Sequence, residues 1–453
     1  MKTLNQTAAA LALGLAAAAS PLIAHAADIE HFTLPNGAQV WFSASPSLPM
    51  LDVRIDFDAG SRRDPAGKAG LANATAHMSD KGVRAAGKLP ALSESQLGEA
   101  WADLGAQFSA SASRDLFSWR LRTLTDEKIL PRAIDLATRQ IGQSAFSAPV
   151  WKRERERMQA ALAESLTRPG TVARRAFDQA LYSGHPYGQH TSAESLAAID
   201  AKDMQAFYRR AAAACAARVS MVGAITREQA ASLASALLAH LPAAGPKACA
   251  EQPAIAEVPP LAKSRRIDIP FDSAQAHVLI GQPGYKRSDA DHFALLVGNH
   301  VLGGGGFASR LMHEVREKRG LSYGAYSQFS PMLHAGAFSI GLQTRPDQAA
   351  QALQVAQQVL AEFVQQGPSE AELKAAKDNL IGGFALLTDS NAKLLAQIAN
   401  IAAYDLPADY LKTWPAQVEK VTAADVRAAF ARVLAPERMV TVVLGAPAGQ
   451  AAK

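Results

Sequence analysis

The chain reads Asp-Ala-Lys-Asp-Met-Gln-Ala-Phe-Tyr at residues 200–208 and Arg-Val-Ser-Met-Val-Gly-Ala at residues 218–224. It reads Thr-Ala-Ala-Asp-Val-Arg-Ala-Ala-Phe at residues 422–430 and Met-Val-Thr-Val-Val-Leu-Gly-Ala at residues 439–446. Both pairs have the pattern of a capped helix followed by an apolar strand that ends in Gly-Ala. The two pairs therefore indicate an internal duplication.

The duplication keeps a constant spacing. Asp203 aligns with Asp425 and Gly223 with Gly445, each at an offset of 222 residues. So long a period indicates duplicated domains and not a solenoid of short repeats. Extended segments alternate with long alanine-rich helical ones, so we predict an α+β fold of two tandem domains, each a mostly antiparallel sheet packed with helices. The predicted boundaries are 27–241 for the N-terminal domain, 242–266 for a linker rich in Pro and Ala, and 267–447 for the C-terminal domain.

The N-terminus has the pattern of a secretion signal. Lys2 precedes a short apolar segment at residues 8–19, and Ala-His-Ala at residues 24–26 fits a cleavage site. We therefore predict a signal peptide at residues 1–26 and an exported, periplasmic protein. The apolar segment is too short to span a bilayer, and no later run of about 20 apolar residues replaces it.

Composition and charge fit a globular protein with no nucleic-acid partner. The 453 residues are 49% hydrophobic and 19% charged, with a formal net charge of +5. The densest charged run, residues 152–157, alternates in sign, which is typical of a solvated helix face and not of a phosphate-binding stripe.

The chain has two cysteines, Cys215 and Cys249. In an oxidising compartment they can form a disulfide that ties the linker to the first domain. The alternative is two buried free thiols. Neither cysteine has the C-x-x-C spacing of a redox or zinc site.

A helix is also predicted at residues 70–82, which read Gly-Leu-Ala-Asn-Ala-Thr-Ala-His-Met-Ser-Asp-Lys-Gly. Asn73, Ala76 and His77 stand at i, i+3 and i+4, so their side chains share one face. Two histidines at i and i+4, with a glutamate just before the second, would bind zinc and supply a general base. Here only one imidazole stands at these positions, and the carboxylate is absent.

Three separated motifs resemble the insulinase/pitrilysin family of inverted zinc peptidases, whose active members carry H-x-x-E-H. The resemblance covers nearly the whole mature chain, includes the duplication, and implies two tandem insulinase-like domains. The motifs are residues 70–82, with their Gly-Leu-Ala start and His-Met-x-x-Lys-Gly end, His-Pro-Tyr-Gly at 185–188, and the segment 302–323, with Leu-Gly-Gly, Ser-Arg-Leu and Val-Arg-Glu-Lys-Arg-Gly-Leu-Ser-Tyr.

Against the family pattern, Asn73 replaces the first zinc-binding histidine and Ala76 replaces the catalytic glutamate, while His77 is kept. The third ligand would fall in the predicted helix at 151–166, which contains three glutamates. We expect no metal site in this chain, and we expect His77 to be a partly buried histidine with a hydrogen-bonding partner. The three glutamates are Glu154, Glu156 and Glu164.

The resemblance gives Arg316 and Tyr323 a different role. In the family an Arg and a Tyr at this spacing reach from the second domain to the zinc site, polarise the scissile carbonyl and stabilise the oxyanion. A planar, permanently charged donor and a phenolic O–H suit that task. The alternative is that Arg316 pairs with Glu314 or Glu317 and that Tyr323 lies in the core.

These features together favour a division of labour between two proteins. We expect a metal-free, non-catalytic subunit of an exported heterodimeric peptidase, which lends Arg316 and Tyr323 to a partner. The partner would be a paralogue with H-x-x-E-H that carries the zinc, and the substrate would be a peptide. One alternative is a peptide-binding or structural pseudoenzyme. Another is a degraded but working metal site built from His77 and Glu164.

Overall fold

The computed structural model describes residues 28–241 and 252–445. The signal peptide predicted at residues 1–26 lies outside these ranges, and so does Cys249 of the expected disulfide, so both stay predictions. The described part of the predicted linker contains neither helix nor strand as far as residue 264. Among the described residues, none of the helices combines the length and apolar character needed to cross a bilayer.

The first sheet has six strands in the order β1-β2-β6-β3-β5-β4. All neighbours are antiparallel except β2 and β6, which are parallel. Strand β3 has the bounds that its alternation of apolar and charged residues predicts. The strands are β1 (Glu30–Thr33), β2 (Gln39–Ala44), β3 (Met50–Phe57), β4 (Gln107–Ala112), β5 (Phe117–Leu124) and β6 (Arg218–Gly223).

The second sheet has the order β7-β11-β8-β10-β9, which repeats the order β2-β6-β3-β5-β4 of the first. Its one parallel pair, β7 and β11, corresponds to β2 and β6. The duplication predicted from the sequence is therefore confirmed in the sheet topology. The strands are β7 (Arg265–Ile269), which begins inside the range predicted as linker, β8 (Ala276–Pro283), β9 (Ala325–Phe329), β10 (Ala337–Thr344) and β11 (Val440–Leu444).

The duplicated helices are capped alike. Asp200 begins one of them and Thr422 the other, and each forms a capping box with the aspartate three residues later. Those aspartates are Asp203 and Asp425, the pair that revealed the repeat. The repeat is therefore visible in the sequence because both copies need the same local hydrogen bonds.

Most helices of the first half pack against one face of the first sheet, around a core that includes Trp119. Helix α6 is the exception, because its Phe177 belongs to an apolar cluster on the second sheet. Helix α2, which carries Asn73, Ala76 and His77, is shorter than the helix predicted at residues 70–82. The helices are α2 (Leu71–Met78), α3 (Glu94–Asp103), α4 (Leu130–Gln143), α5 (Ala148–Ser165), α6 (Pro169–Leu181), α7 (Ala193–Ala197), α8 (Ala201–Ala211) and α9 (Arg227–Leu237).

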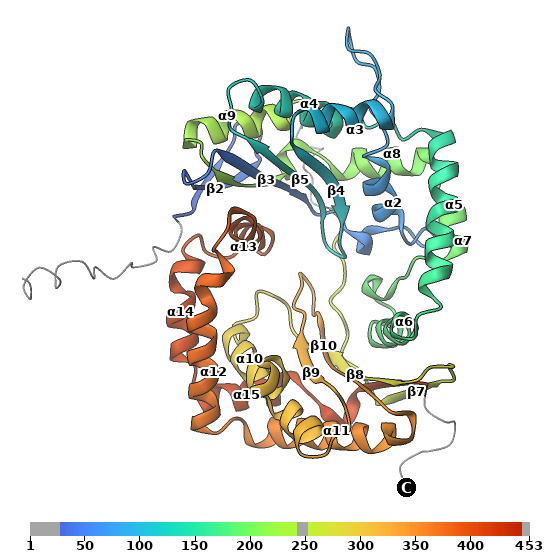
Figure 1. Ribbon diagram of the computed structural model, residues 1–453, viewed down its shortest axis with the longest axis vertical. Coiled ribbons are helices and arrows are strands. Elements are labelled where there is room, and N and C mark those ends of the chain that lie inside the picture. Colours follow the sequence, from blue (N-terminus) through green and yellow to red (C-terminus); the bar gives the residue numbers. More distant parts are fainter. Residues whose placement is uncertain (1–27, 242–251, 446–453) are drawn as a thin grey trace, which may run out of the picture.

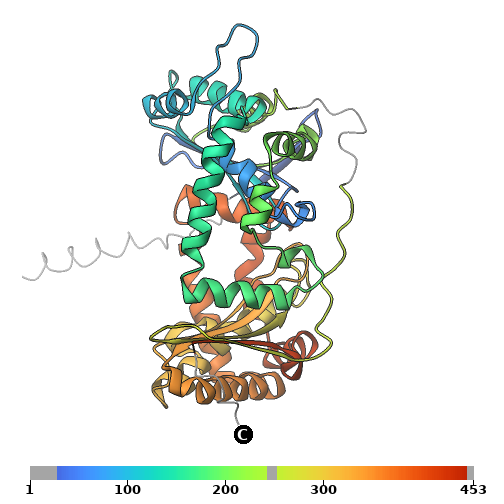
Figure 2. The same cartoon turned by 90° about the vertical axis from the view of Figure 1, so that its right-hand side faces the viewer.

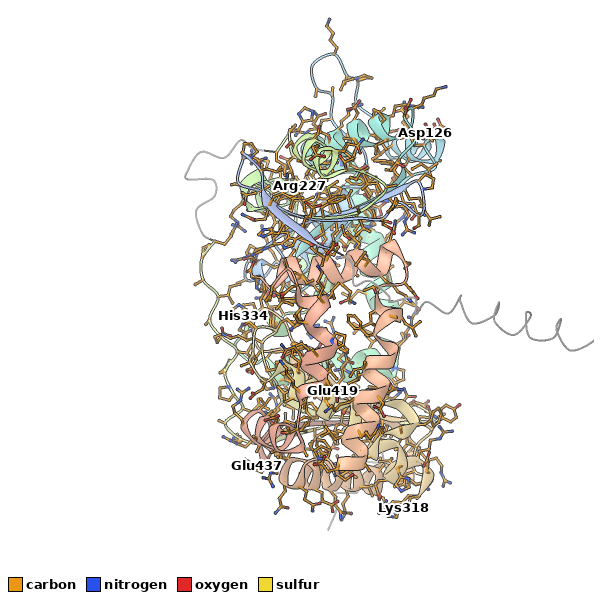
Figure 3. All side chains as sticks on the ribbon, turned by 90° about the vertical axis from the view of Figure 1, so that its left-hand side faces the viewer. Asp126, Arg227, Lys318, His334, Glu419 and Glu437 are labelled. Atoms are coloured by element: carbon orange, nitrogen blue, oxygen red, sulfur yellow. The ribbon has the colours of Figure 1, made fainter. Side chains whose placement is uncertain are left out.

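The helices of the second half cover its own sheet on one face, around a core that includes Phe338, Phe363 and Phe430. Two of them, α12 and α14, run along the length of the molecule toward the first half, as Figure 3 shows. The helices are α10 (His292–Asn299), α11 (Ala349–Gln366), α12 (Glu370–Gly383), α13 (Asn391–Ala403), α14 (Tyr410–Lys420) and α15 (Ala423–Val433).

The amino-acid sequence predicts a continuous helix from Phe307 to Arg319, and the structure shows that this prediction is wrong. Gly306 has a left-handed φ of 61° and Ser309 is extended, so the chain cannot continue one helix through them. A 3-10 turn at Gly306–Ala308 is followed by a π-helical segment, η6 (Met312–Glu317). Gly306 and Ser309 thus interrupt the helix, and η6, which carries Arg316, is a separate segment.

Each half gives one helix to the other half's sheet (Figures 1 and 2). Helix α6 of the first half packs on β8 and β11, where Phe177 joins Val442 in one apolar cluster. Helix α13 of the second half packs on β3 and β6, where Ile398 joins Trp41 and Val222. The two halves therefore share their cores, although the sequence divides them cleanly.

Replacing Ile398 by alanine tests this exchange. Ile398 is fully buried, so its loss removes apolar contacts and leaves a cavity between the halves. We expect Ile398→Ala to lower the free energy of unfolding by about 2–4 kcal/mol, measured by urea denaturation. Leu386→Ala is the control, because Leu386 is 63% exposed and its truncation should change stability little. Equal effects of the two substitutions would contradict the shared core.

Candidate functional site

Helix α2 begins at a glycine that its position requires. Gly70 has φ of 103°, and a Cβ there would stand 2.7 Å from the Thr191 hydroxyl. The Asp64 carboxylate accepts hydrogen bonds from the N–H of Gly70 at 2.7 Å and of Ala72 at 2.9 Å. Burial raises the pKa of Asp64 to about 6, although these backbone donors oppose the shift. The helix is thus held at its N-terminus by a buried carboxylate.

The imidazole of His77 contacts a glutamate on α5. His77 Nε2 lies 2.8 Å from Glu154 Oε2, and the side chain of Glu154 is only 3% exposed. Its other oxygen accepts hydrogen bonds from Arg153 Nε at 2.6 Å and Arg157 Nη1 at 2.9 Å. Burial raises the pKa of Glu154, but hydrogen bonds from His77 and Arg153 and nearby positive charges outweigh it, and the pKa falls to about 2. His77 is therefore a partly exposed histidine with a charged partner.

The residues at this place do not fit a catalytic zinc ion. Such an ion takes three protein ligands and a water. Ala76 is buried and has no group that could accept a proton, and Asn73 is exposed. Within residues 28–241 and 252–445, no group of three or more His, Cys, Asp or Glu side chains could hold a metal ion. The two remaining donors, His77 and Glu154, are bonded to each other.

The alternative site built from His77 and Glu164 is wrong. Glu164 is exposed and pairs with Arg168, at a distance of 2.5 Å, near the end of α5. Of the three glutamates predicted on this helix, Glu154 is the one that reaches α2. A signal was present, because Trp151 and Glu154 share one face of α5 at i and i+3 and are the buried residues of that helix.

Arg316 lies between two aromatic rings and has no ion pair in the described part of the chain. Its Cζ is 4.8 Å from the ring centre of Tyr323 and 4.6 Å from that of Phe307. The carboxylates proposed as its partners are engaged elsewhere. Glu314 pairs with Arg319 and Lys318, and Glu317 pairs with His313. The alternative, in which Arg316 pairs with Glu314 or Glu317, is therefore wrong.

Tyr323 is 85% exposed, so the alternative that placed it in the core is also wrong. It lines a cavity of about 450 Å³ between the second sheet and α6. His277 and Tyr326 come from the sheet, and Arg174 comes from α6. Burial lowers the pKa of His277, which favours its neutral form. Tyr323 thus stands at the rim of a polar cavity to which both halves contribute.

The His-Pro-Tyr-Gly motif joins the halves instead of forming a site. The His185 Nδ1 accepts the N–H of Tyr187 at 3.1 Å, and the Tyr187 hydroxyl donates to Asp115 at 2.5 Å. The backbone N–H of His334 donates to the Tyr187 hydroxyl, and that of Leu333 donates to Asp115. These buried bonds tie the second half to the first, close to where Figure 3 labels His334.

Comparisons with known proteins match both halves of the chain. The insulinase model, peptidase family M16, matches residues 40–195, and the model described as the peptidase M16 inactive domain matches residues 198–380. A solved structure described as a peptidase M16 inactive domain, from Pseudomonas fluorescens, is 33% identical with a TM-score of 0.86. That match covers 94% of this chain and 100% of the other.

Two curated proteins carry different descriptions. An uncharacterized zinc protease of Streptomyces coelicolor is 27% identical over 423 residues, which is 92% of this chain and 89% of that protein. A non-peptidase homologue of Helicobacter pylori is 32% identical over 160 residues, which is 34% of this chain and 36% of that protein. The likeness thus extends to proteins described as proteases and to one described as a non-peptidase.

The ion-pair cluster around Glu154 gives a pH-dependent prediction. Replacing Glu154 by glutamine leaves His77, Arg153 and Arg157 without their carboxylate partner, and we expect the free energy of unfolding to fall by about 1–3 kcal/mol at pH 7, measured by urea denaturation. The pKa of Glu154 is lowered from 4.5 to about 2 on folding. Its contribution is therefore complete above pH 4.5 and is lost as the pH falls toward 2.

The difference between the wild type and Glu154→Gln should accordingly shrink over that pH range. The control is Glu164→Gln, which removes an exposed pair and should cost at most about 1 kcal/mol. A difference that stays constant down to pH 2 would contradict the ionised state of Glu154.

Proposed function

The chain belongs to the insulinase family, peptidase family M16, and on that premise we propose that it is the non-catalytic, metal-free subunit of an exported heterodimeric zinc peptidase. It contributes Arg316 and Tyr323 to substrate binding and oxyanion stabilisation at the zinc site of a partner subunit. The partner is a paralogue with an intact H-x-x-E-H motif, and the substrate is a peptide. The unpaired guanidinium of Arg316, beside an exposed phenol, is the observation that carries this proposal.

The chemistry at α2 supports the absence of independent catalysis. Hydrolysis at a zinc ion needs a base close to the metal-bound water. Ala76 supplies none, and the carboxylate that contacts His77 also accepts hydrogen bonds from two arginines. A carboxylate whose pKa is about 2 is also a poor proton acceptor near neutral pH. The place of the metal site is therefore filled by a structural ion-pair cluster.

The chemistry at η6 supports a retained role in substrate binding. Neighbouring arginines have carboxylate partners, since Arg310 pairs with Glu372 and Arg319 with Glu314. Arg316 is held instead by π faces, which fix the direction of the guanidinium but leave its N–H donors available. Such donors can stabilise the negative charge that develops on a carbonyl oxygen.

A second candidate function is peptide binding without any role in catalysis. Strand β4 is an edge of the first sheet and packs against α2, so its outer backbone groups can pair with an added strand. This pseudoenzyme would hold extended peptides in the same place. The two functions differ in whether Arg316 and Tyr323 change the rate of a partner's reaction.

Zinc binding tests the first part of the proposal. The wild type should retain less than about 0.1 zinc per chain after dialysis, measured by mass spectrometry of metals, because two ligands cannot complete a tetrahedral site. The double variant Asn73→His with Ala76→Glu should retain about one zinc per chain, since His77 and Glu154 are already in place. One tightly bound zinc in the wild type would contradict the metal-free assignment.

Peptide hydrolysis by the mixed subunits tests the second part. The H-x-x-E-H chain that co-purifies with this protein should cleave a quenched-fluorescence peptide slowly by itself and faster with this protein added. Arg316→Ala or Tyr323→Phe should lower the rate of the mixture about 10- to 1000-fold, as expected for loss of an oxyanion donor. Arg319→Gln is the matched control and should leave the rate unchanged, because Arg319 pairs with Glu314. Full activity of the partner alone would favour the pseudoenzyme.

A further inference from the structure

Three arginines lie on the face of the first sheet that looks toward the second half. They are Arg54, Arg120 and Arg122, and we call them the arginine floor. Their strand neighbours, such as Val53 and Leu121, point the opposite way into the core of the first half. Helix α13 packs on the same face, mainly over β6 and β3 (Figure 1), and its residues Ala392 and Leu395 lie beside the arginine floor.

The arginine floor lines a cavity of about 320 Å³ between the sheet and α13. Gln107 and Ser109 of strand β4 form part of its wall, and Ala392 and Leu395 of α13 form another part. The wall from α13 has no charge. The charge of the cavity is therefore set by the sheet alone.

The charges on this face do not cancel. Arg122 binds Asp52 through two N–H groups, at 2.7 and 3.2 Å, and Arg54 Nε lies 2.8 Å from Asp56. Arg120 is exposed and has no ion pair with any residue in the described ranges. One positive charge is left over after both aspartates have been paired.

Arg120 also stands directly across the strand pair from Arg54. Like charges in this position destabilise a sheet. Burial is the main cause that lowers the pKa of Arg120; the charge of Arg54 lowers it further, and Asp56 opposes the shift. A bound anion between the two guanidinium groups would remove their repulsion.

The duplicated half shows that the fold does not need these arginines. Val53 lies opposite Met221 in the first sheet, and Val278 lies opposite Val443 in the second. The same register places neutral residues at all three equivalent positions of the second sheet. Leu279 corresponds to Arg54, Gly341 to Arg120, and Gln343 to Arg122.

The cavity opens toward the free edge of the sheet. Ser109 on the edge strand β4 lies directly opposite Arg120, and its small side chain leaves room above it. Strands in a sheet are about 4.8 Å apart, so a peptide paired with β4 would lie about 10 Å from the β5 backbone. Every second side chain of such a peptide would project from the same face of the sheet as Arg120, because side chains alternate between the two faces of a strand.

We propose that this cavity binds a carboxylate of an extended peptide, held by Arg120 and Arg54, so that the protein selects acidic peptides. The inference rests on the proposed function, because it names the class of peptide that the same chamber receives. Planar guanidinium groups bind carboxylates through paired N–H donors, which suits both an acidic side chain and a C-terminal carboxylate.

Fluorescence anisotropy with three labelled 12-residue peptides tests the proposal on the purified full chain. The first has several glutamates and an amidated C-terminus, the second has glutamines in their place, and the third is the glutamine peptide with a free C-terminus. We expect the glutamate peptide to bind about tenfold more tightly than the amidated glutamine peptide at low salt. That advantage should fall as ionic strength rises.

The variant Arg120→Gln should bring the affinity for the glutamate peptide to within about twofold of that for the glutamine peptide. Arg120→Lys keeps the charge without the planar fork and should give an intermediate value. Arg438→Gln is the matched control, because Arg438 follows Glu437 at the end of the molecule away from the first sheet (Figure 3). Thermal unfolding of all three variants should show that they are folded.

The third peptide assigns the source of the carboxylate. Tight binding of it identifies a C-terminal carboxylate, and weak binding identifies an acidic side chain. Equal affinity for all three peptides, no binding of any of them, or no effect of Arg120→Gln on the peptide that binds most tightly would overturn the proposal. The rate effect of Arg316→Ala on a neutral peptide is independent of these results, so failure of this inference and failure of the proposed function are distinguishable.

Discussion

The reciprocal packing of α6 and α13 is the constraint on which the rest of the structure depends. Each sheet has one face covered by its own helices and a second face that is partly apolar. Phe177 on α6 and Ile398 on α13 cover those second faces from the opposite half. Exposing these apolar strand residues to water would cost free energy, so each half needs a helix of the other half to bury the second face of its sheet. This packing fixes the two sheets face to face. Polar residues of each sheet that α6 and α13 do not cover therefore face the opposite half.

That arrangement explains why the polar residues of functional interest lie where they do. Beyond the edge of α6, the second sheet presents Tyr323 and Tyr326 to a cavity. Beyond the edge of α13, the first sheet presents Arg120 to another. The two cavities occupy equivalent places in the duplicated fold, but one is lined by neutral sheet residues and the other by arginines. The duplicated fold thus contains two cavities in equivalent places, and the different residues on the two sheets give the cavities different charges.

The loss of a metal site did not leave a defect in α2. Glu154 is buried, and a buried carboxylate without partners is costly. His77, Arg153 and Arg157 satisfy it, and the hydrogen bond between His77 on α2 and Glu154 on α5 joins the two helices. His77 and Glu154, which are residue types that can bind zinc, bind each other here. The contacts of Glu154 between α2 and α5 therefore involve none of the residues of η6, which carries Arg316.

The sequence by itself determined the elements and their duplication, because those depend on neighbours a few residues apart. The alternation in β3 and the capping boxes at Asp203 and Asp425 are local patterns, and the structure contains them as predicted. Only the tertiary structure decided the rest. Glu154 meets His77 across 77 residues of chain, and Arg316 lacks a carboxylate because its neighbours Glu314 and Glu317 are taken by other side chains. Such choices among competing partners depend on distances in space, which the order of residues does not specify.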